Sequence, residues 1–289
     1  MKRCLACLAE FEGRDWRCER CGWQPAAENG WPLFAPELAH GGGPDAEYCW
    51  SALAAAEPRH FWFRARRRLI LLALARHMVR PRRALDVGCG NGFILLGLRE
   101  RFPGLELSGA DLRSEGLAYA AARVPGVDLF QMDARRMPFS AEFDAVGAFD
   151  VIEHIAEDEA ALAEIFRALQ PGGCVVLTVP QHPFLWNPAD DFSHHQRRYS
   201  RRELRAKLAA AGFGPIWATS FFSLLLPLLL AVRWYQRWRG APFDPASEVR
   251  VGPGNGALEL VMRIEEALIS WGVRFPAGGS LLMVGRKPA

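Results

Sequence analysis

The stretch LDVGCGNGFILL, residues 85–96, is the part of the sequence that decides the fold. An apolar, strand-like run ends in a turn with three glycines, and an apolar, helix-like run follows. Glycines in such a turn let the backbone approach a ligand closely, and the first amides of the following helix stay free to bind polar groups. The stretch therefore predicts a strand, a turn and a helix that together bind a nucleotide-type ligand.

A dinucleotide fingerprint, G-x-G-x-x-G, is the alternative interpretation of the same turn. Counted from Gly88, the third glycine of that fingerprint falls at Phe93, and counted from Gly90 it falls at Leu95. Neither position holds a glycine, so the turn disfavours a dehydrogenase.

Short apolar runs alternate with helical patterns on both sides of this turn. ALDVG, LELSGADL, VDLFQMD, FDAVGAF and CVVLTVP have strand character, and GPIWATS and SLLMVGRKP supply two later strands. Such alternation is typical of βαβ units. We predict an α/β fold with a doubly wound, mostly parallel, seven-stranded Rossmann-like sheet, preceded by one or two helices in the segment YCWSALAAAEPRHFWFRARRRLILLALARHM.

Length and composition favour one large domain with a small appendage, because the chain has 289 residues and half of them are apolar. We expect a small unit at 1–40 and the main domain at 45–289, with an apolar helical insertion at 220–276 before the last strand. The net charge of +3 does not by itself indicate nucleic acid. The polar N-terminus does not resemble a secretory signal, so the expected location is the cytoplasm.

The first segment contains two CxxC pairs separated by ten residues. Such pairs suit tetrahedral coordination of zinc, and a segment this short needs a staple of that kind to fold. Disulfides are disfavoured in a reducing compartment, and a redox CxxC is disfavoured because two pairs occur together. The sequence therefore predicts a structural zinc ribbon whose metal ligands are Cys4, Cys7, Cys18 and Cys21.

Five motifs in order give the chain its resemblance to the class I S-adenosylmethionine-dependent methyltransferases, over about residues 83–208. The acidic-Gly-x-Gly-x-Gly motif of that family matches the turn, Asp111 matches the acidic residue that binds the ribose hydroxyls, and Asp133 matches the position that faces the adenine amino group. FDAVGAFDVIEHI matches the fourth-strand motif, and LQPGG at 169–173 matches the turn before the fifth strand.

The resemblance implies S-adenosylmethionine as cofactor. Each acidic residue taken alone has a simpler interpretation as a helix cap or turn residue. Family members often lay an aromatic helix over the cofactor with an arginine near its carboxylate, which is the role expected of Arg66, although an arginine-rich helix face is usually only solvated. The implied cofactor-binding residues are Arg66, Asp86, Gly88, Gly90, Gly92, Asp111, Leu112, Asp133, Ala134 and Phe149.

Methyl transfer requires alignment and, when the acceptor is protonated, a base. His154, at the carboxyl end of the fourth strand, is a candidate base or acceptor-orienting residue, and its simpler interpretation is a helix-capping histidine. The loop HPFLWNPADDFSHHQRRYS resembles that of small-molecule and lipid-precursor O-methyltransferases, and it adds His194 and His195 as catalytic candidates. We expect this loop to bind the acceptor. A solvated lid is the alternative, and DDxxHH shows no clear metal-ligand geometry.

The apolar run 216–232 is followed by RWYQRWR. It is short for a membrane span of about 30 Å and contains Pro227, so an interfacial helix at the inner face of the membrane fits better, with Trp and Arg at headgroup level. The alternatives are a cap over the acceptor pocket and a dimer interface.

Three hypotheses for function follow. The first is a methyltransferase that acts on a small-molecule or lipid-linked acceptor, on oxygen, in contact with a membrane surface. The second is an RNA methyltransferase that positions its substrate with the ribbon and the arginine clusters. The third is a non-catalytic scaffold, which the intact glycine turn disfavours. Nothing in the sequence specifies an oligomeric state.

Overall fold

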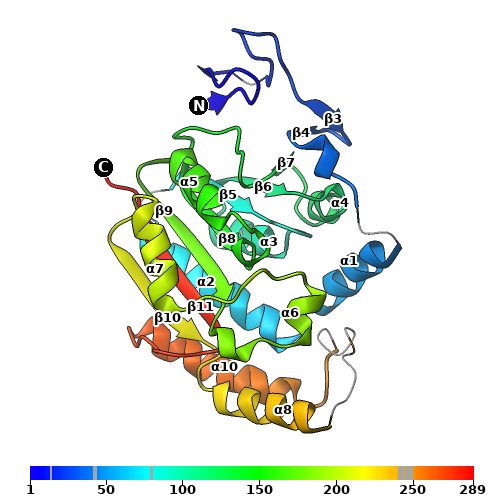
Figure 1. Ribbon diagram of the computed structural model, residues 1–289, viewed down its shortest axis with the longest axis vertical. Coiled ribbons are helices and arrows are strands. Elements are labelled where there is room, and N and C mark those ends of the chain that lie inside the picture. Colours follow the sequence, from blue (N-terminus) through cyan, green and yellow to red (C-terminus); the bar gives the residue numbers. More distant parts are fainter. Residues whose placement is uncertain (14, 42–43, 79–80, 240–243, 245–249) are drawn as a thin grey trace.

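A mixed sheet of nine strands forms the centre of the computed structural model, which describes all residues except 14, 42–43, 79–80, 240–243 and 245–249 (Figure 1). The strand order is β10-β11-β9-β8-β5-β6-β7-β4-β3. In chain order these strands are β3 (Ala26–Glu28), β4 (Trp31–Leu33), β5 (Arg83–Val87), β6 (Glu106–Asp111), β7 (Asp128–Gln131), β8 (Phe143–Phe149), β9 (Leu169–Pro180), β10 (Ile216–Phe221) and β11 (Ser280–Arg286).

The central strands are parallel, and their order reverses next to β5. β6 and β7 follow on one side of β5, whereas β8 and β9 follow on the other side. In open α/β sheets, ligands bind at the carboxyl ends of the strands next to such a reversal. The predicted doubly wound α/β fold is confirmed, and its ligand-binding edge is the edge at which β5, β6, β8 and β9 end.

The sheet has two more strands than the seven predicted. β3 and β4 form an antiparallel hairpin within residues 26–33, and Leu33 pairs in parallel with Gln131 of β7. The Gln131 side chain also binds the amide and the carbonyl of Ala35 at 3.0 and 2.8 Å. This hairpin lies within the range 1–40 that we assigned to the ribbon. Strands of three residues are too short to show a two-residue periodicity, so the sequence did not reveal them.

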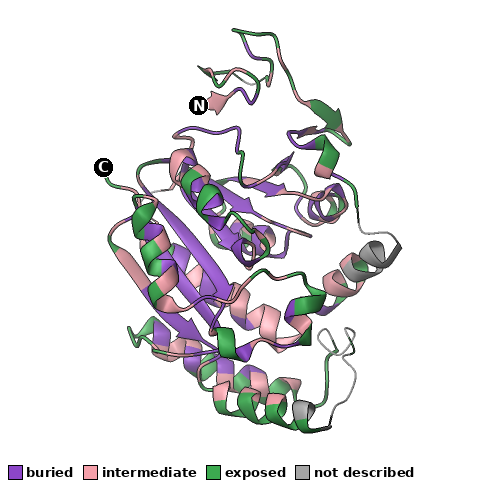
Figure 2. Ribbon diagram, viewed as in Figure 1, coloured by how far each residue is buried: buried purple, intermediate pink, exposed green. Residues whose placement is uncertain are grey.

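Helices cover both faces of the sheet (Figures 1 and 2). Val175 and Leu177 of β9 belong to the core beneath α5 and α7, whereas Val176 belongs to the core beneath α2 and α3. All three side chains are fully buried, as expected for a central parallel strand with a continuous apolar sequence. The helices of this part are α1 (Pro44–Ala56), α2 (Phe61–His77), α3 (Phe93–Arg101), α4 (Ser114–Arg123), α5 (Asp158–Ala168), α6 (Pro188–Phe192) and α7 (Arg201–Ala210), with 3-10 turns η1 (Pro36–Leu38), η2 (Ile152–His154) and η3 (Pro183–Leu185).

In the described residues between the last two strands, α8 (Leu226–Arg239) and α10 (Asn255–Ser270) lie at the end of the molecule opposite the N-terminus (Figure 1). α10 is tied to α2, because Arg68 binds Glu259 at 2.7 Å and Glu266 at 2.6 Å. α8 is mostly exposed (Figure 2). Within the described residues, no helix is both long and apolar enough to cross a membrane.

The N-terminal segment packs against the loop that follows β7. β1 (Lys2–Arg3) and β2 (Glu10–Phe11) pair antiparallel, and the Arg3 amide binds the Pro138 carbonyl at 2.9 Å. The Trp16 ring lies 4.6 Å from that of Phe34 and 5.7 Å from that of Phe139, measured between ring centres. Aromatic burial therefore fixes the segment to the sheet edge.

Candidate active site

The glycine turn, residues 88–92, connects β5 to α3 at the ligand-binding edge. Gly88, Gly90 and Gly92 have φ of 70°, 51° and 77°, a region that residues with a side chain rarely adopt. A Cβ at Gly88 would lie 2.3 Å from a methyl group of Val151. Gly92 caps α3 without a side-chain acceptor, so the first amides of the helix are available to a polar ligand.

Asp86 lies beneath this turn and is almost fully buried. Neither carboxylate oxygen has a hydrogen-bond partner within the described part of the chain. Burial raises the pKa of Asp86 to about 8; the positive charge of Arg66 opposes that rise and the negative charge of Asp111 adds to it. A buried carboxylate without a partner suits a ligand that carries positive charge.

Asp111 ends β6 and holds the turn in place. Its two oxygens accept hydrogen bonds from the amides of Gly90 and Arg113, both at 2.9 Å. Burial raises the pKa of Asp111, and these amides oppose the rise. Beside it, the Leu112 carbonyl accepts from the Gln131 side chain at 2.9 Å, which connects the ends of β6 and β7.

Asp133 follows β7 and is engaged by an arginine that the sequence analysis did not single out. Arg135 binds the Asp133 carboxylate at 2.7 Å and reaches Glu157 at the same distance. Burial alone would raise the pKa of Asp133, but the Arg135 side chain and amide outweigh it and lower that pKa. Ala134, the next residue, is buried. The structure therefore brings Asp133 to the predicted edge in an ion pair.

Arg66 reaches from α2 into the site. Its guanidinium forms an ion pair with Asp150 and donates to the carbonyl of Phe149 at the end of β8. Its guanidinium lies 5.3 Å from the centre of the Trp62 ring. Asp150 has φ of 56°, an uncommon conformation for a residue with a side chain. Arg66 thus belongs to the site and not to a solvated helix face, and its contact with a cofactor stays a prediction.

Trp50 of α1 is a residue of this region that sequence reasoning missed. Its ring lies 3.3 Å from where a Cβ of Gly90 would be and 3.1 Å from the corresponding point at Gly116. α1 therefore lies against the glycine turn and α4. In the sequence, Trp50 is one aromatic residue within an amphipathic segment. That pattern does not show which part of the molecule the ring contacts.

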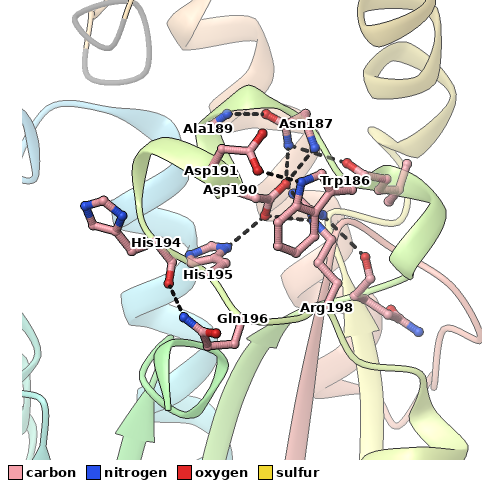
Figure 3. Close-up of polar contacts among 11 residues, drawn as sticks. Trp186, Asn187, Ala189, Asp190, Asp191, His194, His195, Gln196 and Arg198 are labelled. Atoms are coloured by element: carbon pink, nitrogen blue, oxygen red, sulfur yellow. Dashed lines mark hydrogen bonds and ion pairs between the residues drawn. The ribbon is translucent and has the colours of Figure 1, made fainter. Parts of the chain in front are cut away.

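The loop after β9 brings a second group of polar side chains to the same edge (Figure 3). His195 Nδ1 lies 2.8 Å from Asp190, and Arg198 binds the same carboxylate at 2.9 Å. Asp190 is almost fully buried and also accepts from the amide and the side chain of Asn187, both at 2.8 Å, so it fixes the start of α6. His194 points away from Asp190 and is exposed.

Glu153, His154 and His195 form the histidine cluster. One ligand atom of each lies within 4.8 Å of the others, and the two imidazole rings are 4.6 Å apart, centre to centre. The structure brings together two of the three predicted catalytic histidines, His154 and His195, and leaves His194 outside the cluster. Asp190 lies in the loop predicted to bind the acceptor, but neither its contact with His195 nor a role for Glu153 was predicted, because both depend on contacts that the sequence does not show.

Two members of the histidine cluster, Glu153 and His154, have strongly shifted pKa values. Glu153 is fully buried, and neither of its oxygens has a hydrogen-bond partner in the described chain. Burial, with Asp150 nearby, raises its pKa well above the ordinary value. His154 is exposed at its surface, but desolvation by the neighbouring protein atoms and the charge of His195 lower its pKa to about 4. His154 is therefore neutral near pH 7 and able to accept a proton or a cation.

Comparisons with known proteins agree with this geometry. The family described as a methyltransferase domain matches residues 85–177. A demethylmenaquinone methyltransferase of Thermus thermophilus is 41% identical over 126 residues, 42% of this chain and 56% of the relative, so the chain spans less than two thirds of that protein's length. A trans-aconitate 2-methyltransferase of Acidovorax ebreus is 31% identical over 182 residues, 61% of this chain and 68% of the relative.

Among solved structures, phosphoethanolamine N-methyltransferase 2 of Haemonchus contortus, in complex with S-adenosyl-L-methionine, has a TM-score of 0.52. It is 23% identical, over 76% of this chain and 52% of that chain, so the likeness concerns the fold. The glycine turn on β5, the acidic residue that ends β6 and the matched sequence family point to the same conclusion: this chain belongs to the class I S-adenosylmethionine-dependent methyltransferases.

Proposed function

We propose that this protein transfers the methyl group of S-adenosylmethionine to an oxygen of a small-molecule or lipid-linked acceptor. One observation carries the proposal: the ligand-binding edge holds the glycine turn with the buried, unpaired carboxylate of Asp86, and the histidine cluster lies at the ends of β8 and β9 along that edge. The relatives named for demethylmenaquinone and trans-aconitate support the acceptor class.

The cofactor half of the site consists of Asp86, the glycine turn, Asp111 and Asp133. S-adenosylmethionine supplies a methyl group that its sulfonium activates for displacement. A positively charged end of the cofactor would lower the raised pKa of Asp86 and pair with its ionised carboxylate. Asp111, which still has lone pairs free, offers acceptors to the ribose hydroxyls. Gly90 and Gly92 allow close approach of the backbone. Arg66 is the cation available to the cofactor's carboxylate.

The acceptor half consists of the histidine cluster and Asp190. Asp190 accepts from the Nδ1 hydrogen of His195, so Nε2 is the basic nitrogen. In the proposed step His195 takes the proton of the acceptor hydroxyl, the oxygen forms a bond to the methyl carbon, and the carbon–sulfur bond breaks. The products are a methyl ether, S-adenosylhomocysteine and a protonated histidine that returns its proton to water.

Titration calorimetry with S-adenosylmethionine tests the cofactor half. We expect the intact protein to bind, an Asp111→Ala variant to lose binding, and an Asp128→Ala variant, altered at the exposed start of β7, to bind as the parent does. Intact, folded protein that does not bind would refute the proposal and favour the scaffold hypothesis. Binding with turnover only on RNA would replace the small-molecule acceptor by the RNA hypothesis.

The ribbon cysteines are proposed to bind one structural zinc ion. The sulfur atoms of Cys4, Cys7, Cys18 and Cys21 lie within 4.8 Å of one another, which supports a tetrathiolate site. Metal analysis of the purified protein should find zinc, and a Cys7→Ser variant should lose it. Zinc retained at full occupancy by that variant would contradict this assignment.

Contact with a membrane surface is proposed for α8 and α10. Trp234 and Trp238 are 71% and 73% exposed, and Trp271 after α10 is 81% exposed. Leu228 on α8 and Leu260 on α10 are exposed as well, and the sequence of α8 contains arginines but no acidic residue. Large exposed aromatic and apolar side chains beside arginines suit a bilayer with anionic headgroups.

Vesicle co-sedimentation tests this contact. Phosphatidylglycerol vesicles should retain the protein more than phosphatidylcholine vesicles, and a double Trp234→Ser, Trp238→Ser variant should stay in the supernatant with an unchanged melting temperature. If the parent protein stays in the supernatant with both vesicle types, the membrane contact is wrong.

A further inference from the structure

We propose that the histidine cluster binds a divalent first-row transition-metal ion through one carboxylate oxygen of Glu153 and one imidazole nitrogen each of His154 and His195. This set differs from the DDxxHH pattern that the loop shows in sequence. Asp190 contacts His195, Asp191 accepts from the Trp186 indole at 3.0 Å, and His194 points away. The ligands come instead from the end of β8 and from the loop after α6.

The Glu153 carboxylate is the first argument for a cation. It is fully buried, and neither oxygen has a hydrogen-bond partner among the described residues. Arg66 and Arg198 act on Glu153 through their charge alone, because each is paired with another carboxylate, Arg66 with Asp150 and Arg198 with Asp190. A buried carboxylate left without a partner is costly, and a bound cation removes that cost.

The orientation of His195 is the second argument. Asp190 holds the Nδ1 side of the ring at 2.8 Å, which leaves Nε2 as the ligand atom (Figure 3). Histidine ligands of metals almost always donate their other nitrogen to a carboxylate, a carbonyl or water, which fixes the ring and raises its basicity. Asp190 itself is fixed by Asn187 and Arg198, so the ring position is built into the fold.

The ligand set indicates the class of metal. Two imidazoles and one carboxylate suit zinc, manganese or iron, whereas calcium and magnesium prefer oxygen ligands alone. Three protein ligands leave coordination positions open. An acceptor oxygen bound at such a position would lose its proton more readily, so a bound ion would take over from His195 the activation of the acceptor in the proposed methylation on oxygen.

The experiment is a Co²⁺ titration of the protein that carries one zinc ion per chain, at the ribbon cysteines, followed by visible absorption, with neither S-adenosylmethionine nor acceptor present. We expect one additional ion per chain, with d–d bands but without the thiolate-to-cobalt charge-transfer band that a ribbon cysteine would produce. His195→Ala and His154→Ala should each weaken Co²⁺ binding by about tenfold or more. His194→Ala, next to the cluster but outside it, should bind as the parent does.

Circular dichroism of each variant shows whether it is folded. His195→Ala is the decisive variant, because a partly exposed position in a loop tolerates truncation of its side chain. No uptake of Co²⁺ beyond the ribbon would overturn the proposal, and so would equal affinity in the parent, His195→Ala and His154→Ala. The titration uses no cofactor, so either outcome would leave the proposed methyl transfer unaffected, with His195 acting as a base without a metal ion.

Discussion

The cofactor half and the acceptor half each contain one buried carboxylate without a hydrogen-bond partner in the described chain, Asp86 and Glu153, and they differ in how their other carboxylates are held. In the cofactor half, Asp111 accepts two backbone amides and Asp133 is paired with Arg135, two residues further along the chain. In the acceptor half, Glu153 has no partner of this kind, and Asp190 binds His195 and Arg198 in a buried network. The first half is built from local motifs, whereas the second depends on how a long loop packs against the end of the sheet.

The largest loss of stability is expected in the glycine turn, where a side chain would have the least space. Gly88→Ala places a side chain at φ of 70° and 2.3 Å from a Val151 methyl group. Strain and overpacking together should lower the free energy of unfolding by about 3–5 kcal/mol and abolish binding of S-adenosylmethionine. Chemical denaturation and calorimetry measure the two effects.

Gly126→Ala is the matched control, since Gly126 has φ of 79° but no heavy atom within 4 Å of a Cβ placed there. It should cost only about 1–2 kcal/mol, the strain alone, and leave cofactor binding intact. Equal losses in the two variants would show that the contact with Val151 has no importance for the turn.

Removing one member of the buried network of Asp190, His195 and Arg198 should clearly lower the free energy of unfolding. Asp190→Ala leaves Arg198 and His195 without their carboxylate and should lower the free energy of unfolding by about 3 kcal/mol. Asp133→Ala removes a partly exposed pair with Arg135 and should cost under about 1 kcal/mol. Urea denaturation of both variants gives the comparison, and similar losses would remove the distinction between the two halves.

The last effect is confined to acidic pH and concerns protonation of His154. Its pKa of about 4 in the folded state lies below the ordinary value near 6.5, so the unfolded chain binds a proton that the folded chain does not. Stability should therefore fall as the pH drops from about 6.5 towards 4, and this contribution should be absent in His154→Gln. An NMR titration of the ring protons should show the low pKa, and His195→Ala should raise it. A midpoint near 6.5 in the parent would show that neither desolvation nor His195 shifts the pKa of this exposed ring.

Much of the fold was readable because its signals are local. The run CVVLTVP predicted a strand, and these residues lie in β9, where Val175, Val176 and Leu177 are fully buried. The LQPGG segment, predicted as the turn before the fifth strand, instead forms the start of β9. Phe143 pairs with Leu169 and Ala145 pairs with Cys174, so residues 170–173 form a bulge there. The β3–β4 hairpin was missed because its three-residue strands have no periodicity of their own.

The sequence by itself determined the alternation of strands and helices, the glycine turn, the acidic residues of the cofactor half and the two CxxC pairs. Each of these depends on neighbours in the chain, on side-chain periodicity or on a backbone conformation that only glycine adopts easily. Only the tertiary structure decided that Arg66 pairs with Asp150, that Trp50 covers the turn and that Glu153 meets His195. Burial and pairing between distant segments depend on how whole elements pack, and no local pattern records that.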